Sequence, residues 1–75
     1  TIVDALGGKI NIVSIENCMT RLRVVVDNPN LINEKVLKDT GASGFVRPTK
    51  ENIQIVYGLK VDQIASYVKA YLKSI

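Results

Sequence analysis

Apolar and polar residues nearly alternate over residues 9–17, which predicts a β-strand because neighbouring side chains of a strand point to opposite faces. The apolar phase shifts by one position between Ile12 and Val13. A β-bulge would explain this shift, and bulges often redirect side chains beside functional sites. Before this strand, residues 1–6 predict a short helix that Thr1 caps and that two glycines end.

A cleaner alternation covers residues 20–27 and predicts a second strand. One face carries Arg21, Arg23 and Val25. The opposite face carries three apolar residues, Leu22, Val24 and Val26. Because the two strands are so close in sequence, the residues between them, 17–19, predict the turn of a hairpin. Cys18 would then lie at the hairpin tip.

The remaining residues predict a helix, two short strands and a final helix. Asn33 can cap a helix over residues 34–40, which Gly41 ends. Strands are predicted over residues 44–49 and 53–57. The final helix is the clearest element, because its apolar residues recur at the spacing of one helical face. These residues are Val61, Ile64, Ala65, Val68 and Leu72.

This order of elements predicts an α+β fold in a single domain, residues 1–75. Hairpin connections imply antiparallel pairing, and the helices must cover one sheet face to bury their apolar residues. We therefore expect a two-layer sandwich, with a four-stranded antiparallel sheet and three helices on one face. The second sheet face would be open to solvent, which suits Arg21 and Arg23.

Composition narrows the chemistry that this chain can perform. With one cysteine and no histidine, it can form no internal disulfide, and we expect neither a metal site nor a cofactor. No apolar run is long enough to span a membrane, and an unpaired thiol is typical of a reducing compartment, so we expect a cytoplasmic domain. The net charge of +3 is too small to imply a nucleic-acid partner by itself.

The stretch from Cys18 to Arg23 contains the side chains of a reactive anion site. Nearby arginines favour the cysteine thiolate, which is the nucleophilic form. The guanidinium groups of Arg21 and Arg23 offer paired donors that match phosphoryl oxygens, and Thr20 adds a hydroxyl and a backbone N–H. An exposed turn also presents backbone N–H groups to an anion. The stretch therefore predicts a nucleophile beside a clamp for a phosphoryl group.

Each of these residues alone has a simpler interpretation. A lone cysteine is most often a small buried apolar residue, arginines on a strand often form a solvated face, and Gln54 alone would be a surface residue. Met19 and Phe45 would usually be core residues, whereas exposed beside the thiol they would form a docking patch. Cys18 lies in a predicted turn, outside any apolar run, and its combination with Thr20 and the arginines favours a functional site.

The same stretch resembles a known signature. Asn11-Ile12, five residues, then Cys18-x-Thr20-Arg21-Leu22-x-Val24-x-Val26-Asp27 is similar to the phosphorylation-site signature of one family. That family is the glucose-family IIB domains of the bacterial phosphoenolpyruvate-dependent sugar phosphotransferase system. Further likeness lies in Gly7-Gly8-Lys9, in the glycines at positions 41 and 44, and in the segment Ile53-Gln54-Ile55-Val56-Tyr57-Gly58. The resemblance covers nearly the whole chain.

The resemblance implies an enzyme component that carries a phosphoryl group within a sugar permease. Cys18 would accept the group from the phosphohistidine of a IIA domain and pass it to a sugar held by the membrane-embedded IIC domain. Arg21 and Arg23 match arginines needed for transfer to the sugar. Thr20 and Gln54 match positions beside the phosphocysteine.

The resemblance also implies a fold, a location and a supporting residue. The family fold, a four-stranded antiparallel sheet with three helices on one side, agrees with the fold expected from the residues. The family commonly has Asp-Ala before the cysteine, and this chain has Glu16-Asn17, so we include Glu16 as a supporting residue. We expect a domain at the cytoplasmic face of the cell membrane, part of or associated with a larger permease. It would be monomeric in isolation and bind no nucleic acid.

Two other functions fit parts of the sequence. A small nucleic-acid-binding module could use Arg21 and Arg23, but the chain has only 4 aromatic residues (3 Tyr and 1 Phe) and no stacking motif. A thiol redox protein could use a reactive Cys18, but the chain has no resolving cysteine. Salt-dependent RNA binding would favour the first function. Faster reaction with peroxide than with a phosphodonor would favour the second.

Overall fold

The computed structural model describes residues 2–75, so the capping role expected for Thr1 lies outside the described residues. The strands of this part of the chain are β1 (Ile12–Asn17), β2 (Arg21–Val26), β3 (Gly44–Val46) and β4 (Asn52–Val56). Its helices are α1 (Ile2–Ala5), α2 (Glu34–Asp39) and α3 (Val61–Ser74). Among residues 2–75, none of the helices combines the length and the apolar character needed to cross a bilayer.

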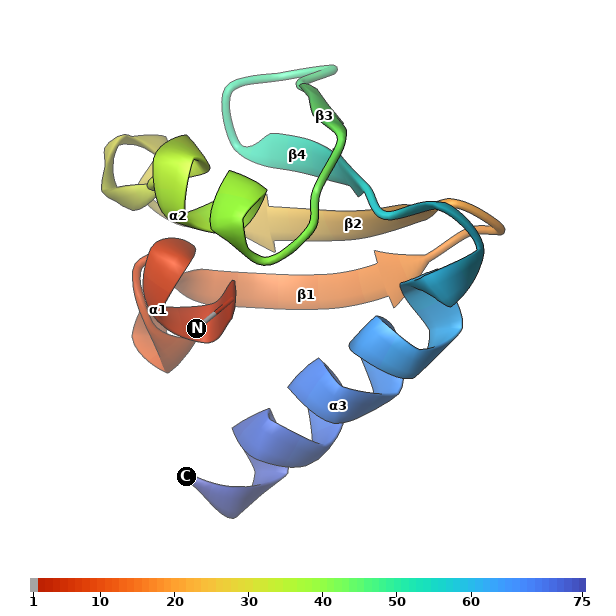
Figure 1. The fold of residues 1–75 in the computed structure, drawn as a ribbon. Helices are drawn as coiled ribbons and strands as arrows, with labels where there is room; N and C mark the ends of the chain where they lie inside the picture. Colours follow the sequence, from red (N-terminus) through yellow and green to blue (C-terminus); the bar gives the residue numbers. More distant parts are fainter. Residues whose placement is uncertain (1) are drawn as a thin grey trace.

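The four strands form one antiparallel sheet in the order β1-β2-β4-β3 (Figure 1). The tip of the β1–β2 hairpin lies at the same end of the sheet as the connection from β4 to α3, and α1 and α2 lie toward the opposite end (Figure 1). Two hydrogen bonds join the hairpin to that connection, since the backbone N–H groups of Tyr57 and Gly58 both donate to the Thr20 oxygen at 3.0 Å.

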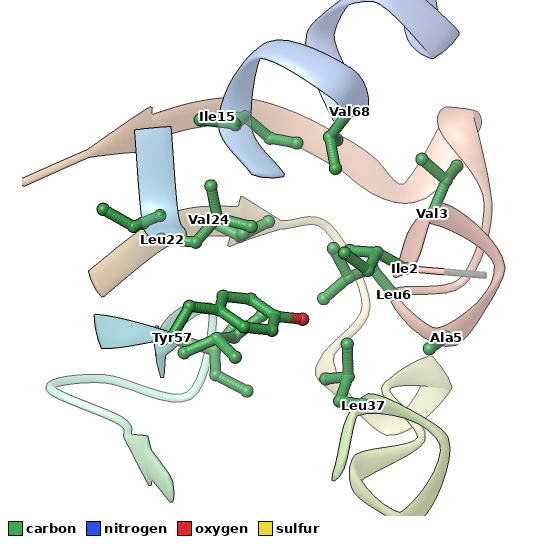
Figure 2. Close-up of a cluster of buried hydrophobic side chains, with 14 of the residues drawn as sticks. Ile2, Val3, Ala5, Leu6, Ile15, Leu22, Val24, Leu37, Tyr57 and Val68 are labelled. Carbon is green, nitrogen blue, oxygen red and sulfur yellow. The ribbon is translucent and has the colours of Figure 1, made fainter. Parts of the chain in front are cut away.

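One face of the sheet is covered by all three helices. Buried side chains from the helices, such as Val3, Leu37 and Val68, belong to one apolar cluster with Leu22 and Val24 of β2 (Figure 2). The opposite face of β2 carries the arginines, which are exposed. This arrangement confirms the expected two-layer α+β sandwich with an open sheet face.

The helices and strands are the predicted ones in the predicted order, and only the residues at which they begin and end differ. Asn33 caps α2 by accepting a hydrogen bond from the Val36 N–H at 3.2 Å, and Gly41 follows that helix with a φ of 103°. The third strand was predicted over residues 44–49, but β3 ends at Val46. It ends two residues before Pro48, which has no N–H to donate to a neighbouring strand. Short 3-10 turns add to the predicted elements at Lys9–Asn11, Pro29–Leu31 and Gly58–Lys60.

The first strand was predicted correctly in its bulge and wrongly in its beginning. The pairing of β1 with β2 shifts between Ile12 and Ser14, which confirms a bulge at Val13. However, residues 9–11 form a 3-10 turn, so the strand begins at Ile12 and not at residue 9. Ile10, expected to alternate with Ile12 in the strand, is instead 99% exposed.

The buried residue of this turn is the polar Asn11, which is 4% exposed. Its amide nitrogen donates to the Leu6 oxygen at 2.8 Å and the Asn28 oxygen at 3.0 Å, and its Oδ1 accepts from the Asn28 N–H at 2.7 Å. Gly7 makes room for this side chain, because a Cβ at its φ of 97° would lie 2.6 Å from the amide nitrogen. Asn11 therefore joins the ends of β1 and β2 to the end of α1.

We expect Asn11→Ala to lower the free energy of unfolding by roughly 3 kcal/mol, because it leaves buried backbone groups without partners. The measurement is urea unfolding followed by circular dichroism. Ile10→Ala is the matched control, and its exposed side chain should contribute little. Equal stability of the two variants would contradict the role given to Asn11.

Candidate functional site

Cys18 lies in the turn between β1 and β2, where the sequence placed it. The thiol is free and partly exposed, so the interpretation as a buried apolar residue is wrong. The backbone N–H of Cys18 donates to the Arg21 oxygen at 3.0 Å and closes the turn. The turn thus presents the sulfur at the end of the sheet.

The electrostatics of the turn favour the thiolate. Hydrogen bonds from the backbone of Thr20 and then of Arg21 lower the pKa of Cys18 below its ordinary value of 9.0. Partial burial opposes this effect, and the positive charges of Arg23 and then Arg21 lower the pKa further. The sequence predicted the effect of the two arginine charges on the pKa of Cys18. The backbone hydrogen bonds to the sulfur lower this pKa more than the charges do.

The arginines lie on the open sheet face as predicted, and Gln54 lies beside them. Arg21 donates from Nη1 to Gln54 Oε1 at 3.0 Å. In the strand register, Arg23 pairs with Gln54 of β4 on one side and with Glu16 of β1 on the other. Glu16, Arg23 and Gln54 line a shallow depression of about 360 Å³ on this face. The structure therefore places Glu16, Arg21, Arg23 and Gln54 on the open part of β1, β2 and β4, next to the turn that contains Cys18 and Thr20.

Glu16 lies close to Arg23 through strand pairing, but the two side chains form no ion pair. Within residues 2–75, an ion pair joins Arg47 and Glu34 at 2.8 Å. The same part of the chain contains no group of three or more His, Cys, Asp or Glu side chains that could hold a metal ion. The Arg23 guanidinium therefore remains available to an anionic ligand.

The surface around the turn is apolar at two points. Met19 is 84% exposed, which fits the docking patch considered for it, whereas Phe45 is half-buried against the core. Leu59 is 91% exposed and follows Gly58, whose N–H is bonded to the turn. Sequence reasoning missed Leu59, because only the pairing between the turn and the β4–α3 connection brings it near Cys18.

Two further polar residues reach the turn that sequence reasoning did not single out. The Asn17 amide nitrogen donates to the Cys18 oxygen at 3.1 Å and to Asp62 Oδ1 at 2.8 Å. Asp62 lies in the first turn of α3. Asparagine before a turn was the available signal, but its partner lies 45 residues away in sequence.

We expect alkylation of Cys18 by iodoacetamide to reach half its maximal rate below pH 9.0 in the folded chain. The thiolate reacts and the thiol does not, so a lowered pKa moves the whole rate profile toward lower pH. Unfolding the same chain in urea removes the backbone donors and should return the midpoint to that of an ordinary thiol. Identical midpoints in the two conditions would contradict the geometry of the turn.

Comparison with known proteins identifies relatives of this chain. A family model described as phosphotransferase system, EIIB, matches residues 1–33. The N-acetylglucosamine-specific EIIB component of Streptomyces coelicolor is 47% identical over 68 residues, which cover 91% of this chain and 87% of that protein. The maltose-specific EIICB component of Escherichia coli is 46% identical over 63 residues, or 84% of this chain. The match spans only 12% of the length of that relative.

A solved structure has the same fold. It is one domain of the IIabc component of the phosphotransferase system from Clostridium difficile, with a TM-score of 0.69 and 28% sequence identity. The match covers 91% of this chain and 73% of that one. The alignment of nearly the whole chain agrees with the two-layer fold described above.

Proposed function

This chain belongs to the EIIB family of the phosphotransferase system, and we propose that Cys18 is the residue on which it carries a phosphoryl group. The observation that carries the proposal is the convergence of the Thr20 and Arg21 backbone donors on the Cys18 sulfur. Donors that stabilise a thiolate can also bind the oxygens of a phosphoryl group attached to the same atom. We propose that residues 1–75 act as a single domain of this kind.

The first step of the proposed reaction is acceptance of the phosphoryl group. The Cys18 thiolate attacks the phosphorus of a phosphohistidine on a IIA domain, so an S–P bond forms and the N–P bond breaks. The leaving imidazole nitrogen takes up a proton. Thr20 and the two arginines, Arg21 and Arg23, bind the phosphoryl oxygens during this transfer.

The second step passes the group to a sugar held by a IIC domain. A sugar hydroxyl attacks the phosphorus, the S–P bond breaks, and Cys18 leaves as a thiolate while the hydroxyl proton passes to a base. Gln54 holds the Arg21 guanidinium from the β4 side. Glu16, which pairs with Arg23 in the strand register, would orient the Arg23 guanidinium during this transfer. The exposed Met19 and Leu59 offer an apolar contact for the partner domains.

The relatives support the choice of partners. The names EIICB and IIabc join the B component with C, and with both A and C, in single proteins. A sugar is named for two relatives, maltose for one and N-acetylglucosamine for the other. We therefore propose a sugar as the final acceptor for this chain, and a place at the cytoplasmic face of a membrane permease, as a monomer that binds no nucleic acid.

Incubation with a phosphorylated IIA domain tests this function. The intact mass of the chain should rise by one phosphoryl group, and peptide mapping should place the label on Cys18. The rate at which alkali releases the label should match that of a phosphoryl group bound to sulfur and differ from that of phosphoserine. An unchanged mass, with the donor shown to phosphorylate an EIIB relative, would overturn the proposal.

A further inference from the structure

One side chain ties the cysteine turn to the start of the last helix. Asn17 is the final residue of β1, and both of its amide hydrogens have acceptors, the Cys18 oxygen and Asp62 Oδ1. The two bonds use the two different hydrogens of one nitrogen. The amide thus bridges the backbone of the turn and a carboxylate of α3.

Asp62 accepts its hydrogen bond from Asn17 at a helix that packs firmly on the sheet. It lies in the first turn of α3, where the helix dipole favours a carboxylate. Val61 beside it and Val68, two turns further along, are fully buried and anchor the helix against the sheet. The backbone position of the exposed Asp62 is therefore set by the core, and its hydrogen bond to Asn17 links that position to the turn.

The bridge determines which polar groups the turn presents. A trans peptide is planar, so the Cys18 carbonyl and the Met19 N–H point in opposite directions. The hydrogen bond from the Asn17 amide holds the carbonyl oxygen on one side of this peptide unit and therefore directs the Met19 N–H to the opposite side. Rotation of this peptide unit would bring carbonyl lone pairs toward phosphoryl oxygens, which would repel them.

We infer that Asn17, held by Asp62, is a positioning residue that keeps the Cys18–Met19 peptide oriented for phosphoryl acceptance. Asn17 does not touch the reacting atoms and acts through the backbone of the turn. The hydrogen bonds from Tyr57 and Gly58 to the Thr20 oxygen hold the other end of the same turn. This inference rests on the proposed role of Cys18.

The test compares four variants and one control variant in two assays. We expect Asn17→Ala and Asp62→Ala each to slow phosphoryl acceptance about fivefold, the effect of one lost hydrogen bond. Asp62→Asn keeps an acceptor oxygen and should retain nearly the original rate. Because the residues act through one bond, the double variant Asn17→Ala/Asp62→Ala should be no slower than Asn17→Ala.

The second assay is the pH profile of Cys18 alkylation, which needs no phosphodonor. Loss of the bridge should move its midpoint upward in Asn17→Ala and Asp62→Ala, but not in Asp62→Asn or in the control Gln63→Ala, an exposed neighbour on α3. A merely structural role would lower thermal stability and leave this midpoint unchanged.

The outcomes separate this inference from the proposed function. An unchanged rate and midpoint in Asn17→Ala would overturn the bridge, as would an Asp62→Asn variant that is as impaired as Asp62→Ala. If the wild-type chain accepts no phosphoryl group, the proposed function fails, while the alkylation midpoints still test whether Asn17 and Asp62 position the turn.

Discussion

Cys18→Ser should accept no phosphoryl group from a phosphorylated IIA domain, whereas the wild-type chain should be labelled to completion. A serine hydroxyl in the same turn has the same backbone donors and the same arginines around it. It remains protonated at neutral pH and lacks the nucleophilicity of a thiolate. The variant therefore keeps the clamp and removes the nucleophile. Intact mass measured over the course of the reaction follows the label directly.

Two controls make this result specific to the sulfur. Wild-type chain alkylated at Cys18 before the reaction should also remain unlabelled, although its backbone and arginines are unchanged. The variant should unfold at nearly the wild-type urea concentration, because Cys18 is partly exposed and makes no contact in the core. A phosphoryl label retained by Cys18→Ser would show that another residue carries the group.

The elements of this fold could be predicted because most of their determinants are local. The alternation through β2, the Asn33 cap and the apolar face of α3 each lie within one short segment. The bulge at Val13 was visible for the same reason, as a shift of phase within one strand. The residues of the reactive turn were also found locally, because Cys18 and its arginines are neighbours in the chain.

The features that the sequence did not show depend on contacts between residues far apart in the chain. Ile10 was predicted to lie in a strand, but it lies in a 3-10 turn and is exposed. Its neighbour Asn11 is buried instead, because its side chain binds the backbone of Asn28, 17 residues away. The bond between Arg21 and Gln54 spans 33 residues. Such contacts follow from the strand order β1-β2-β4-β3, which local alternation does not specify.

The strand order also gives the two arginines different environments, which the spacing of two residues concealed. Arg21 lies next to the turn and bonds Gln54, whereas Arg23 lies between Glu16 and Gln54 in the register. The charge of Arg23 lowers the pKa of Cys18 more strongly than the charge of Arg21 does. In the proposed function both guanidinium groups bind the phosphoryl oxygens. Arg21 is preoriented by its hydrogen bond, and Arg23 must adjust to its ligand.

Arg21→Gln and Arg23→Gln should each slow transfer from phosphocysteine to sugar about 100-fold, a loss equivalent to removing one charged donor from the transition state. The measurement is the decay of phosphorylated chain, prepared in advance, when a IIC domain and sugar are added. Arg47→Gln is the matched control, because Arg47 pairs with Glu34 and lies outside the site. Similar rates for all three variants would contradict a role for the clamp.

Lysine variants then separate charge from geometry. Arg23→Lys keeps the positive charge that lowers the pKa of Cys18, so its alkylation midpoint should stay near the wild-type value. It loses the planar fork that binds two phosphoryl oxygens together, so transfer to sugar should remain impaired. Arg23→Gln should raise the midpoint and slow transfer as well. If Arg23→Lys transferred phosphoryl groups at the wild-type rate, charge alone would account for the contribution of Arg23, and the bidentate contact would be excluded.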